Sequence, residues 1–370
     1  MTARIVVFGA TGYTGRLTAA ALAAAGHKPL LAGRSSKKLA ELAQQLGGQL
    51  DTQVASSDDP ASVCALLRAG DVLVSTVGPF TLHGDCAVEA AITQRAHYVD
   101  STGEPGFIRR VFTHYGQDAA RAGVALLTAC GYDYIPGHLA AGLALERAGA
   151  AAQRVDIGYY MTQRSPSAQI FSQGTLASTR VAGMHAGMEW QSGQLVERFG
   201  ALRVREFEVA GKSRAGISLG SSEHYALPSS YPQLQDINVY LGWYGKRSYM
   251  MSRGARALAA VRKLPLIGEL PVWLASRGAH SQGEGPSAED RASTTSHIVG
   301  VAYDQAEHEL SRVELQGKNG YDFTAGILAW SAVQLAQHGS RKLGACGPIE
   351  AFGLEALRQG CAQAGISPGE

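Results

Sequence analysis

Three glycines near the start of the chain, Gly9, Gly12 and Gly15, have the spacing Gly-x-x-Gly-x-x-Gly. They lie between a short apolar run at 4–8, typical of a buried strand, and Ala-rich helical sequence at 17–25. In that context the glycines permit a tight turn, a close backbone approach to a pyrophosphate and close packing of the helix. The N-terminus of the helix would hold the phosphates. The predicted dinucleotide contacts are Gly9, Thr11, Gly12, Tyr13, Thr14 and Gly15.

The residues after the next strand, 29–32, indicate which dinucleotide is bound. An NAD-binding unit usually places an Asp or Glu there, against the ribose 2′-hydroxyl. Here no acid follows, and the run is Gly33-Arg34-Ser35-Ser36-Lys37-Lys38. A guanidinium can bind a 2′-phosphate through a bidentate fork. A basic first turn of a solvated helix would explain the lysines but not the missing acid. We therefore predict NADP(H) as the cofactor, with contacts from Arg34, Ser35 and Lys38.

A sheet must position these turns. Up to about residue 148, apolar strands alternate with helical segments, which is typical of a parallel sheet with crossover helices. The six expected strands match a doubly wound fold, whose ligand lies outside the carboxyl ends of the strands. The candidate site is therefore formed by the loops after the first, second, fourth, fifth and sixth strands.

Beyond residue 150 the pattern changes to strands with few helices between them, which indicates a largely antiparallel sheet. Strands are expected at 154–161, 202–209, 217–226, 236–241, 296–303 and 307–316, and helices at 172–188, 321–337 and 349–364. The predicted fold class is α/β, with an N-terminal doubly wound Rossmann domain and a second α+β domain built on a largely antiparallel sheet. We expect the Rossmann domain at 1–131, a substrate and dimerisation domain at 132–339, and a C-terminal helix within 340–370 that packs back on the first domain.

Composition narrows the class of protein. The length of 370 residues favours two domains, and the net charge of +2 gives no indication of a nucleic-acid partner. Five scattered cysteines without a Cys-x-x-Cys pair favour free thiols in a reducing compartment. We find no signal peptide and no apolar run of about twenty residues that could span a bilayer. The expectation is a cytoplasmic globular enzyme.

Residues 255–278 mix apolar and basic side chains with two prolines. They could form a hydrophobic lid, a subunit interface or a segment that touches a membrane. Burial in an interface or against the same domain is the favoured interpretation, because the apolar residues do not follow a clear helical period.

Other catalytic motifs are absent or misplaced. Gly216-Ile217-Ser218-Leu219-Gly220 spells a nucleophile elbow but lacks a hydrophobic strand before it. No tyrosine has a lysine four residues later, which removes the proton-donating pair of short-chain dehydrogenases. The sequence has no metal-ligand spacing, so no metal is predicted.

Several motifs together resemble a known family. They are the opening strand, turn and helix, Val77-Gly78-Pro79-Phe80, the run 131–136 (Gly-Tyr-Asp-Tyr-Ile-Pro), the run 285–291 and the run 320–325. With them the chain resembles the saccharopine dehydrogenase-like oxidoreductases, especially the branch that contains the trans-acting enoyl reductases of lipid and polyketide biosynthesis. The resemblance implies hydride transfer between NADPH and a C=C bond in that branch, or a C=N bond in the opine-forming branch.

The resemblance also implies roles for particular residues. Those expected to line the nicotinamide are Thr76, Val77, Gly78, Pro79 and Phe80. Those expected to contact the substrate or supply a proton are Tyr132, Asp133 and Tyr134, although solvent could also supply the proton and Asp133 could instead cap the helix that begins near Pro136. From the second domain the candidates are Tyr160, Arg164, Thr175, Arg180 and His185, each with a core or surface role as the alternative.

Three functions are compatible with these residues. The first is an NADPH-dependent enoyl-type reductase in lipid, polyketide or other secondary metabolism, acting on a small molecule, hydrophobic or carrier-bound, as a homodimer. The second is a saccharopine- or opine-type dehydrogenase or an imine reductase. That chemistry needs cations for substrate carboxylates, from at least two of Arg164, Arg180, Arg203 and Arg205. The third is a protein that binds NADP(H) without turnover.

Overall fold

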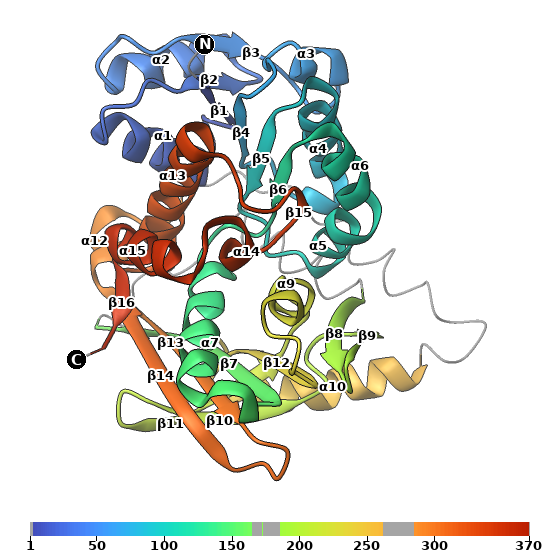
Figure 1. The fold of residues 1–370 in the computed structure, drawn as a ribbon. Coiled ribbons are helices and arrows are strands. Elements are labelled where there is room, and N and C mark those ends of the chain that lie inside the picture. The colour runs from blue at the N-terminus through green and yellow to red at the C-terminus, as the bar shows by residue number, and fades with distance from the viewer. Residues whose placement is uncertain (1–2, 165–171, 173–185, 262–284, 370) are drawn as a thin grey trace. The chain divides into compact units, whose positions relative to one another are not determined.

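The computed structural model describes residues 3–164, 172, 186–261 and 285–369. The chain divides into two compact units. The first unit comprises Met1–Thr102, Phe107–Ile135 and Gly320–Ile366, and the second comprises Gly103–Gly106, Pro136–Asn319 and Ser367–Glu370. Each unit is built on its own sheet (Figure 1).

The first unit contains a parallel sheet of seven strands in the order β15-β6-β5-β4-β1-β2-β3. The strands are β1 (Ile5–Phe8), β2 (Leu30–Gly33), β3 (Thr52–Val54), β4 (Val72–Ser75), β5 (His97–Asp100), β6 (Ala125–Leu127) and β15 (Gly344–Ala345). β1 and β4 are fully buried, as expected of strands covered on both faces. They are also neighbours, so the strand order reverses between them. This is the doubly wound topology that the alternating sequence predicted.

Helices cover both faces of this sheet (Figure 1). On one face lie α3 (Pro60–Cys64), α4 (Phe80–Gln94) and α6 (Gly116–Ala122), preceded by α5 (Pro105–Arg110) and a π-helical turn, Val111–Tyr115. On the other lie α1 (Tyr13–Ala24), α2 (Ser36–Gln45) and α13 (Gly320–His338), which packs against α1, β4 and β5. After β15 follow α14 (Pro348–Phe352) and α15 (Leu354–Ala364), and α15 packs on α13.

The second unit contains a mixed, mostly antiparallel sheet in the order β10-β11-β12-β7-β13-β14-β16, with β8 and β9 attached through β12. Its strands are β7 (Arg154–Gln163), β8 (Gly187–Gln191), β9 (Gln194–Arg198), β10 (Val204–Val209), β11 (Lys212–Ser218), β12 (Asp236–Leu241), β13 (Thr294–Tyr303), β14 (Glu309–Gly317) and β16 (Ile366–Pro368). The predicted fold class is therefore confirmed, and β12 pairs with β7 in parallel.

The helices of the second unit are α7 (Ile135–Ala148), α9 (Glu223–Ser230), α10 (Arg247–Val261) and α12 (Ala288–Ala292), with a 3₁₀ turn at Gly149–Ala151. α7 crosses the sheet at Gly300, where a Cβ atom would lie only 2.6 Å from the Ala140 carbonyl carbon. The opposite face carries a cluster of aromatic and β-branched side chains, among them Tyr160, Phe207 and Tyr303.

Two local predictions in this unit are wrong. Residues 217–226 were predicted as one strand, but β11 ends at Ser218 and α9 begins at Glu223. Residues 187–188 were predicted as the end of a helix and instead begin β8, one strand of a hairpin that the sequence analysis missed. The rest of the predicted helix at 172–188 lies outside the described residues, apart from 172 and 186.

The unit boundaries differ from the domain limits expected from the sequence. Those limits were 131/132 and 339/340, whereas the chain leaves the first unit after Ile135 and re-enters it at Gly320. α13 thus lies with the first unit, because its apolar side chains pack on α1 and the parallel sheet. None of the described helices is long and apolar enough to cross a bilayer.

Candidate functional site

The turn after β1 is shaped by Gly9, which has a φ of +85°. Its N–H donates to the Ala32 carbonyl at 2.9 Å, and its carbonyl accepts from Thr76 Oγ1 at 3.2 Å. A Cβ atom at Gly9 would lie 2.7 Å from Thr76 Oγ1 and 2.9 Å from Val77 Cγ2. Only glycine fits here, because both the left-handed backbone and the close approach of the next strand end exclude a side chain.

The start of α1 is left open for an anion. Gly12 is its N-cap and supplies no capping side chain, and the first turn contains no acid. A Cβ atom at Gly15 would lie 2.2 Å from the Gly9 carbonyl oxygen, so the helix can pack on the turn only with glycine there. The positive end of α1 can therefore meet a phosphate group without a competing carboxylate. Thr11, Tyr13 and Thr14 are partly buried at the same turn.

The basic residues after β2 lie in the turn into α2. Arg34 is exposed and has no hydrogen-bond or ion-pair partner among residues that the structure describes. Ser35 caps α2 by accepting from the Lys38 N–H at 3.4 Å, which leaves its own O–H able to donate. Gly33 lies beside Thr11, because a Cβ atom there would be 3.6 Å from Thr11 Oγ1. Arg34 therefore follows directly after Gly33, which lies beside the glycine turn.

The loop after β4 lies against the glycine turn, on the other side of the point where the strand order reverses. Val77 and Pro79 are partly buried and Gly78 is exposed, and the Gly78–Pro79 peptide bond is cis. Phe80 differs from the other predicted nicotinamide contacts. Its ring is 5% exposed and packs on Phe107 with 5.6 Å between ring centroids. The buried Phe80 ring therefore anchors the end of this loop in the core.

A buried carboxylate, Asp100, ties the end of β5 to the loop after β6. It accepts hydrogen bonds from Thr102 N at 2.8 Å, Ala129 N at 2.9 Å and Thr128 Oγ1 at 2.7 Å. Burial raises the pKa of Asp100 to about 6, although these donors act in the opposite direction. The bonds hold Ala129 at a φ of +57°, the start of the turn that carries the predicted substrate residues.

Of the three predicted substrate residues in this turn, Asp133 is best suited to move a proton. Its Oδ1 is buried without a hydrogen-bond partner in the described part of the chain, so that oxygen does not cap α7. Burial raises the pKa of Asp133 from 3.8 to about 7. Tyr132 is 5% exposed, and its N–H donates to Thr324 Oγ1 at 2.9 Å. Tyr134 is completely buried, and its N–H donates to the Ala129 carbonyl at 3.1 Å.

Residues 5–127 match the family described as saccharopine dehydrogenase NADP binding domain. The first unit carries a saccharopine dehydrogenase NADP binding domain. Over 98% of this chain and 96% of the relative, the sequence is 29% identical to Rv2449c of Mycobacterium tuberculosis, provisionally named as a trans-acting enoyl reductase. It is also 37% identical to the trans-acting enoyl reductase of Mycobacterium bovis (strain BCG), over 36% of this chain and 34% of that protein.

A solved structure shares the fold. Apo saccharopine dehydrogenase (L-Glu forming) from Saccharomyces cerevisiae superposes with a TM-score of 0.57 over 96% of both chains, at 12% sequence identity. At this identity the likeness concerns the fold alone. The matched NADP binding domain and the enoyl reductase relatives indicate an NADP-dependent oxidoreductase, which confirms the predicted enzyme class.

The geometry of the saccharopine dehydrogenase NADP binding domain fits the dinucleotide. The space that a Cβ atom would fill at Gly9 and Gly15 is already occupied by protein atoms, whereas the Gly12 Cβ position has a single close neighbour, the Gly9 carbonyl oxygen at 3.2 Å. Of Gly9, Gly12 and Gly15, only Gly12 is exposed. It is therefore the position at which a ligand backbone contact is available.

The substrate residues predicted in the second unit have different surroundings. Tyr160 is buried, its O–H donates to the Arg214 carbonyl at 3.2 Å, and burial raises its pKa well above 10. Its ring lies 6.0 Å from that of Phe207, so it has the core role named as the alternative. Arg164 is exposed, and its N–H donates to the Ser293 carbonyl at 2.9 Å. Thr175, Arg180 and His185 lie outside the described residues.

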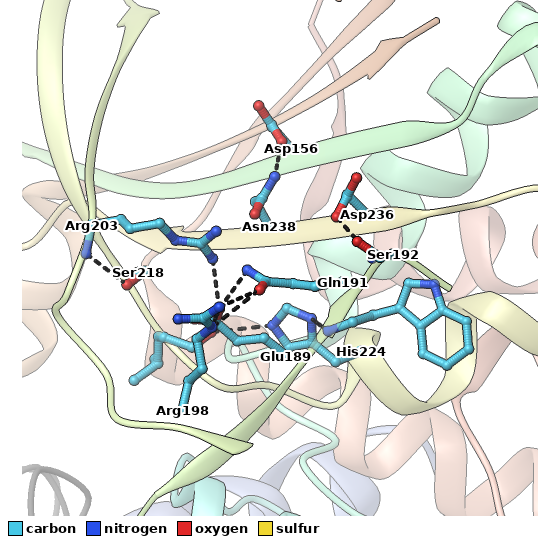
Figure 2. A network of polar contacts seen from close by, with 12 residues as sticks. Asp156, Glu189, Gln191, Ser192, Arg198, Arg203, Ser218, His224, Asp236 and Asn238 are labelled. Atoms are coloured by element: carbon cyan, nitrogen blue, oxygen red, sulfur yellow. Dashed lines mark hydrogen bonds and ion pairs between the residues drawn. The ribbon is translucent and has the colours of Figure 1, made fainter. Parts of the chain in front are cut away.

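Arginines of this unit pair with buried carboxylates, and Figure 2 shows the pair of Arg203 with Glu189. Arg203 Nη2 lies 2.7 Å from Glu189 Oε2, and Arg198 also approaches this carboxylate, at 3.6 Å. Arg205 forms an ion pair with Asp156, which is completely buried and accepts from Asn238 Nδ2 at 2.7 Å. Burial raises the pKa values of both carboxyl groups, and the nearby guanidinium groups act against this shift.

The sequence analysis missed residues that support the site. Thr324 and Tyr321 come from α13: Thr324 holds the Tyr132 amide, and the Tyr321 ring packs edge-on against Tyr13 at 5.0 Å. Asp100 and Thr128 were also missed. A signal existed for each pair, since Asp100 ends the fifth expected strand, at 98–100, and the run 320–325 contributed to the family resemblance. No group of three metal-ligating side chains occurs in the ranges that the structure covers.

Proposed function

We propose that the protein is an NADPH-dependent reductase that transfers a hydride to the C=C bond of an enoyl-type intermediate of lipid, polyketide or other secondary metabolism. The names of the two mycobacterial relatives support this reaction. NADPH, when bound, supplies the hydride. The protein must then hold the acceptor carbon within about 3–3.5 Å of the nicotinamide and deliver a proton.

The proposed cofactor contacts follow from the shape of the first unit. Gly9, Gly12 and Gly15 would form the turn that holds the pyrophosphate, and the N–H groups in the first turn of α1 would bind the phosphates. Arg34 offers its guanidinium to the 2′-phosphate, with Ser35 and Lys38 as further donors. Thr76 holds the turn through the Gly9 carbonyl, and Val77, Gly78 and Pro79 line the nicotinamide side.

The proposed proton donor is Asp133. Hydride addition to the β-carbon of an enoyl group leaves an enolate, which needs a proton at the α-carbon. A carboxyl group with a pKa of about 7 is close to half protonated at neutral pH, which suits a general acid. Tyr132 and Tyr134 shape the same loop, and the Tyr132 hydroxyl is the second candidate for the proton.

The pairing of Arg203 and Arg205 is the observation that favours an enoyl substrate over an amino acid. A saccharopine- or opine-type reaction requires at least two cations to bind substrate carboxylates. Glu189 and Asp156 already neutralise these two arginines, so neither guanidinium lacks an ionic partner that a substrate carboxylate could replace without competition. Among the predicted clamp residues that the structure describes, Arg164 alone has an unengaged guanidinium.

The remaining parts of the proposal are a hydrophobic or carrier-bound small-molecule substrate, a homodimer and a cytoplasmic location. All five cysteines are free, which agrees with a reducing compartment. Sedimentation equilibrium would test the dimer, and a single monomeric species at micromolar concentration would contradict it.

A substrate panel tests the reaction. NADPH consumption would be followed with 2-enoyl thioesters, cyclic imines, and 2-keto acids with an amine donor. We expect turnover of the enoyl thioesters, with deuterium from labelled NADPH found at the β-carbon of the product. Turnover confined to imines or keto acids would overturn the proposal, as would tight NADPH binding without turnover of any of the three classes.

A further inference from the structure

Helix α10 has one face on the sheet and one face in solvent. Ser248 and Ser252 are buried, and their hydroxyls donate to the carbonyls of Ala215 and Leu202 at 3.5 Å and 3.1 Å. On the other side, Tyr249 is 45% exposed and Met250 is 68% exposed. Met250 has the highest exposed fraction among the exposed large hydrophobic side chains of the described residues.

The exposed face of α10 is strongly basic. Lys246, Arg247, Arg253 and Arg256 are all exposed, and no Asp or Glu occurs from residue 237 to 261. The first three have no side-chain hydrogen bond or ion pair among the residues with described positions. Arg256 Nε donates to the Leu202 carbonyl at 2.7 Å. Glu206 on β10 contacts the helix and accepts from the Tyr249 hydroxyl at 2.7 Å.

This charge is not shared by the whole molecule. The chain is close to neutral, at +2, and the nearby arginines Arg198, Arg203 and Arg205 are paired with Glu189 or Asp156. The cations here are unlike them, because Lys246 and three arginines of α10 lie within eleven residues, and α10 itself contains no Asp or Glu. Such a face is complementary to a surface of negative charge.

We infer that the exposed face of α10 binds the surface of an anionic lipid membrane. Basic side chains on a helix are attracted to anionic headgroups, and an exposed Met and Tyr can enter the boundary between headgroups and acyl chains. A second copy of the chain is a poor occupant, because a two-fold interface would place the same cations opposite one another. The inference is independent of the proposed reaction, because its test measures vesicle binding and not enzyme activity.

Vesicle co-sedimentation tests this inference with the full-length protein. One set of vesicles contains phosphatidylcholine alone, and the other contains phosphatidylcholine with phosphatidylglycerol. We expect binding to the second set, loss of binding at high salt, and little binding to the first. Because each basic side chain near an anionic surface contributes about fivefold to partitioning, R247Q/R253Q is expected to bind about thirtyfold more weakly. Met250→Ser is expected to cause a further loss that persists at low salt.

The matched control is R68Q/R121Q, which removes two exposed arginines of the first unit. It should bind vesicles like the wild type. Circular dichroism and NADPH affinity should be unchanged in all variants, since none alters the proposed cofactor contacts. Equal losses in the control and the α10 variant would overturn the inference, as would equal binding to both vesicle sets. Binding to polyglutamate but not to vesicles would overturn the inference and identify an acidic protein as the occupant. If the wild type binds no vesicles and Met250→Ser lowers the mass of its oligomer in solution, the occupant is a second copy of the chain.

Discussion

The two units handle polar chemistry in opposite ways. At the carboxyl edge of the parallel sheet, the proposed site consists of backbone amides, glycines and one carboxyl group without a partner at Oδ1, Asp133. In the second unit, the buried carboxylates Glu189 and Asp156 each form ion pairs with arginines. Polar groups left without partners mark a place for a ligand, whereas paired charges mark a place where the fold itself uses them.

Asp133→Asn tests the open carboxyl group and has the largest expected effect. If Asp133 is the general acid, kcat/KM for the preferred enoyl substrate should fall about a thousandfold. In the wild type, the rate should fall as pH rises through about 7, because burial raises the pKa of Asp133 to that value and only the protonated form donates. The variant should lose this limb of the pH profile. An unchanged limb in the variant would assign the proton to another group, with Tyr132→Phe as the next variant.

Gly12→Val tests whether the backbone turn is the phosphate site. NADPH affinity, measured by fluorescence titration, should fall by roughly a hundredfold, because branched methyl groups would occupy the space needed by the pyrophosphate. The backbone at Gly12 has a φ of −73°, so valine should be accommodated without unfolding. The control is Ala24→Val, at the exposed far end of the same helix. Retained tight binding in Gly12→Val would contradict the assignment.

Arg34→Asp tests the choice of cofactor. Loss of a charge-assisted contact and repulsion of the 2′-phosphate should lower NADPH affinity about thirtyfold and leave NADH affinity equal or improved. Lys37→Asp, in the same turn, is the matched control and should have a much smaller effect. Equal effects in both variants would show that general positive charge, and not the Arg34 guanidinium, selects the cofactor.

Glu189→Gln tests the paired carboxylates of the second unit and has the smallest expected effect. Removing the charge leaves Arg203 without its ionic partner and should lower the free energy of unfolding by about 1.5 kcal/mol. The cost is modest because the Arg203 side chain is 35% exposed. Urea denaturation would measure it, and NADPH affinity should not change. A loss of turnover without a loss of stability would instead make this pair part of a substrate site.

The features predicted well from the sequence depend on neighbouring residues. Gly9, Gly12 and Gly15 lie within one strand, turn and helix, so their spacing together with the flanking apolar run and helical sequence predicts the turn. The alternation of strands and helices likewise predicted the parallel sheet. The error at 217–226 has a local cause, because a short run of mixed polar and apolar residues with no clear period fits a strand and a short helix equally well.

The features that could not be predicted join distant parts of the chain. Thr324 reaches the Tyr132 amide across 192 residues, and Arg203 meets Glu189 from another strand. No spacing rule connects such pairs, because their contact depends on the register of strands and on how helices pack. Tyr160 illustrates the same limit, since only the packed structure places its ring against Phe207 and not in a site.

The hydrogen bond from the Tyr132 amide to Thr324 has a consequence for the evolution of such proteins. It joins the segment where the chain departs from the nucleotide-binding fold, at Ile135, to the segment where it returns, at Gly320. A hydrogen bond within the first unit therefore holds the two ends of the intervening stretch, 136–319, near each other. Because the entropic cost of a longer loop grows only slowly with its length, replacements of very different size could be grafted between these two points without loss of the parent architecture.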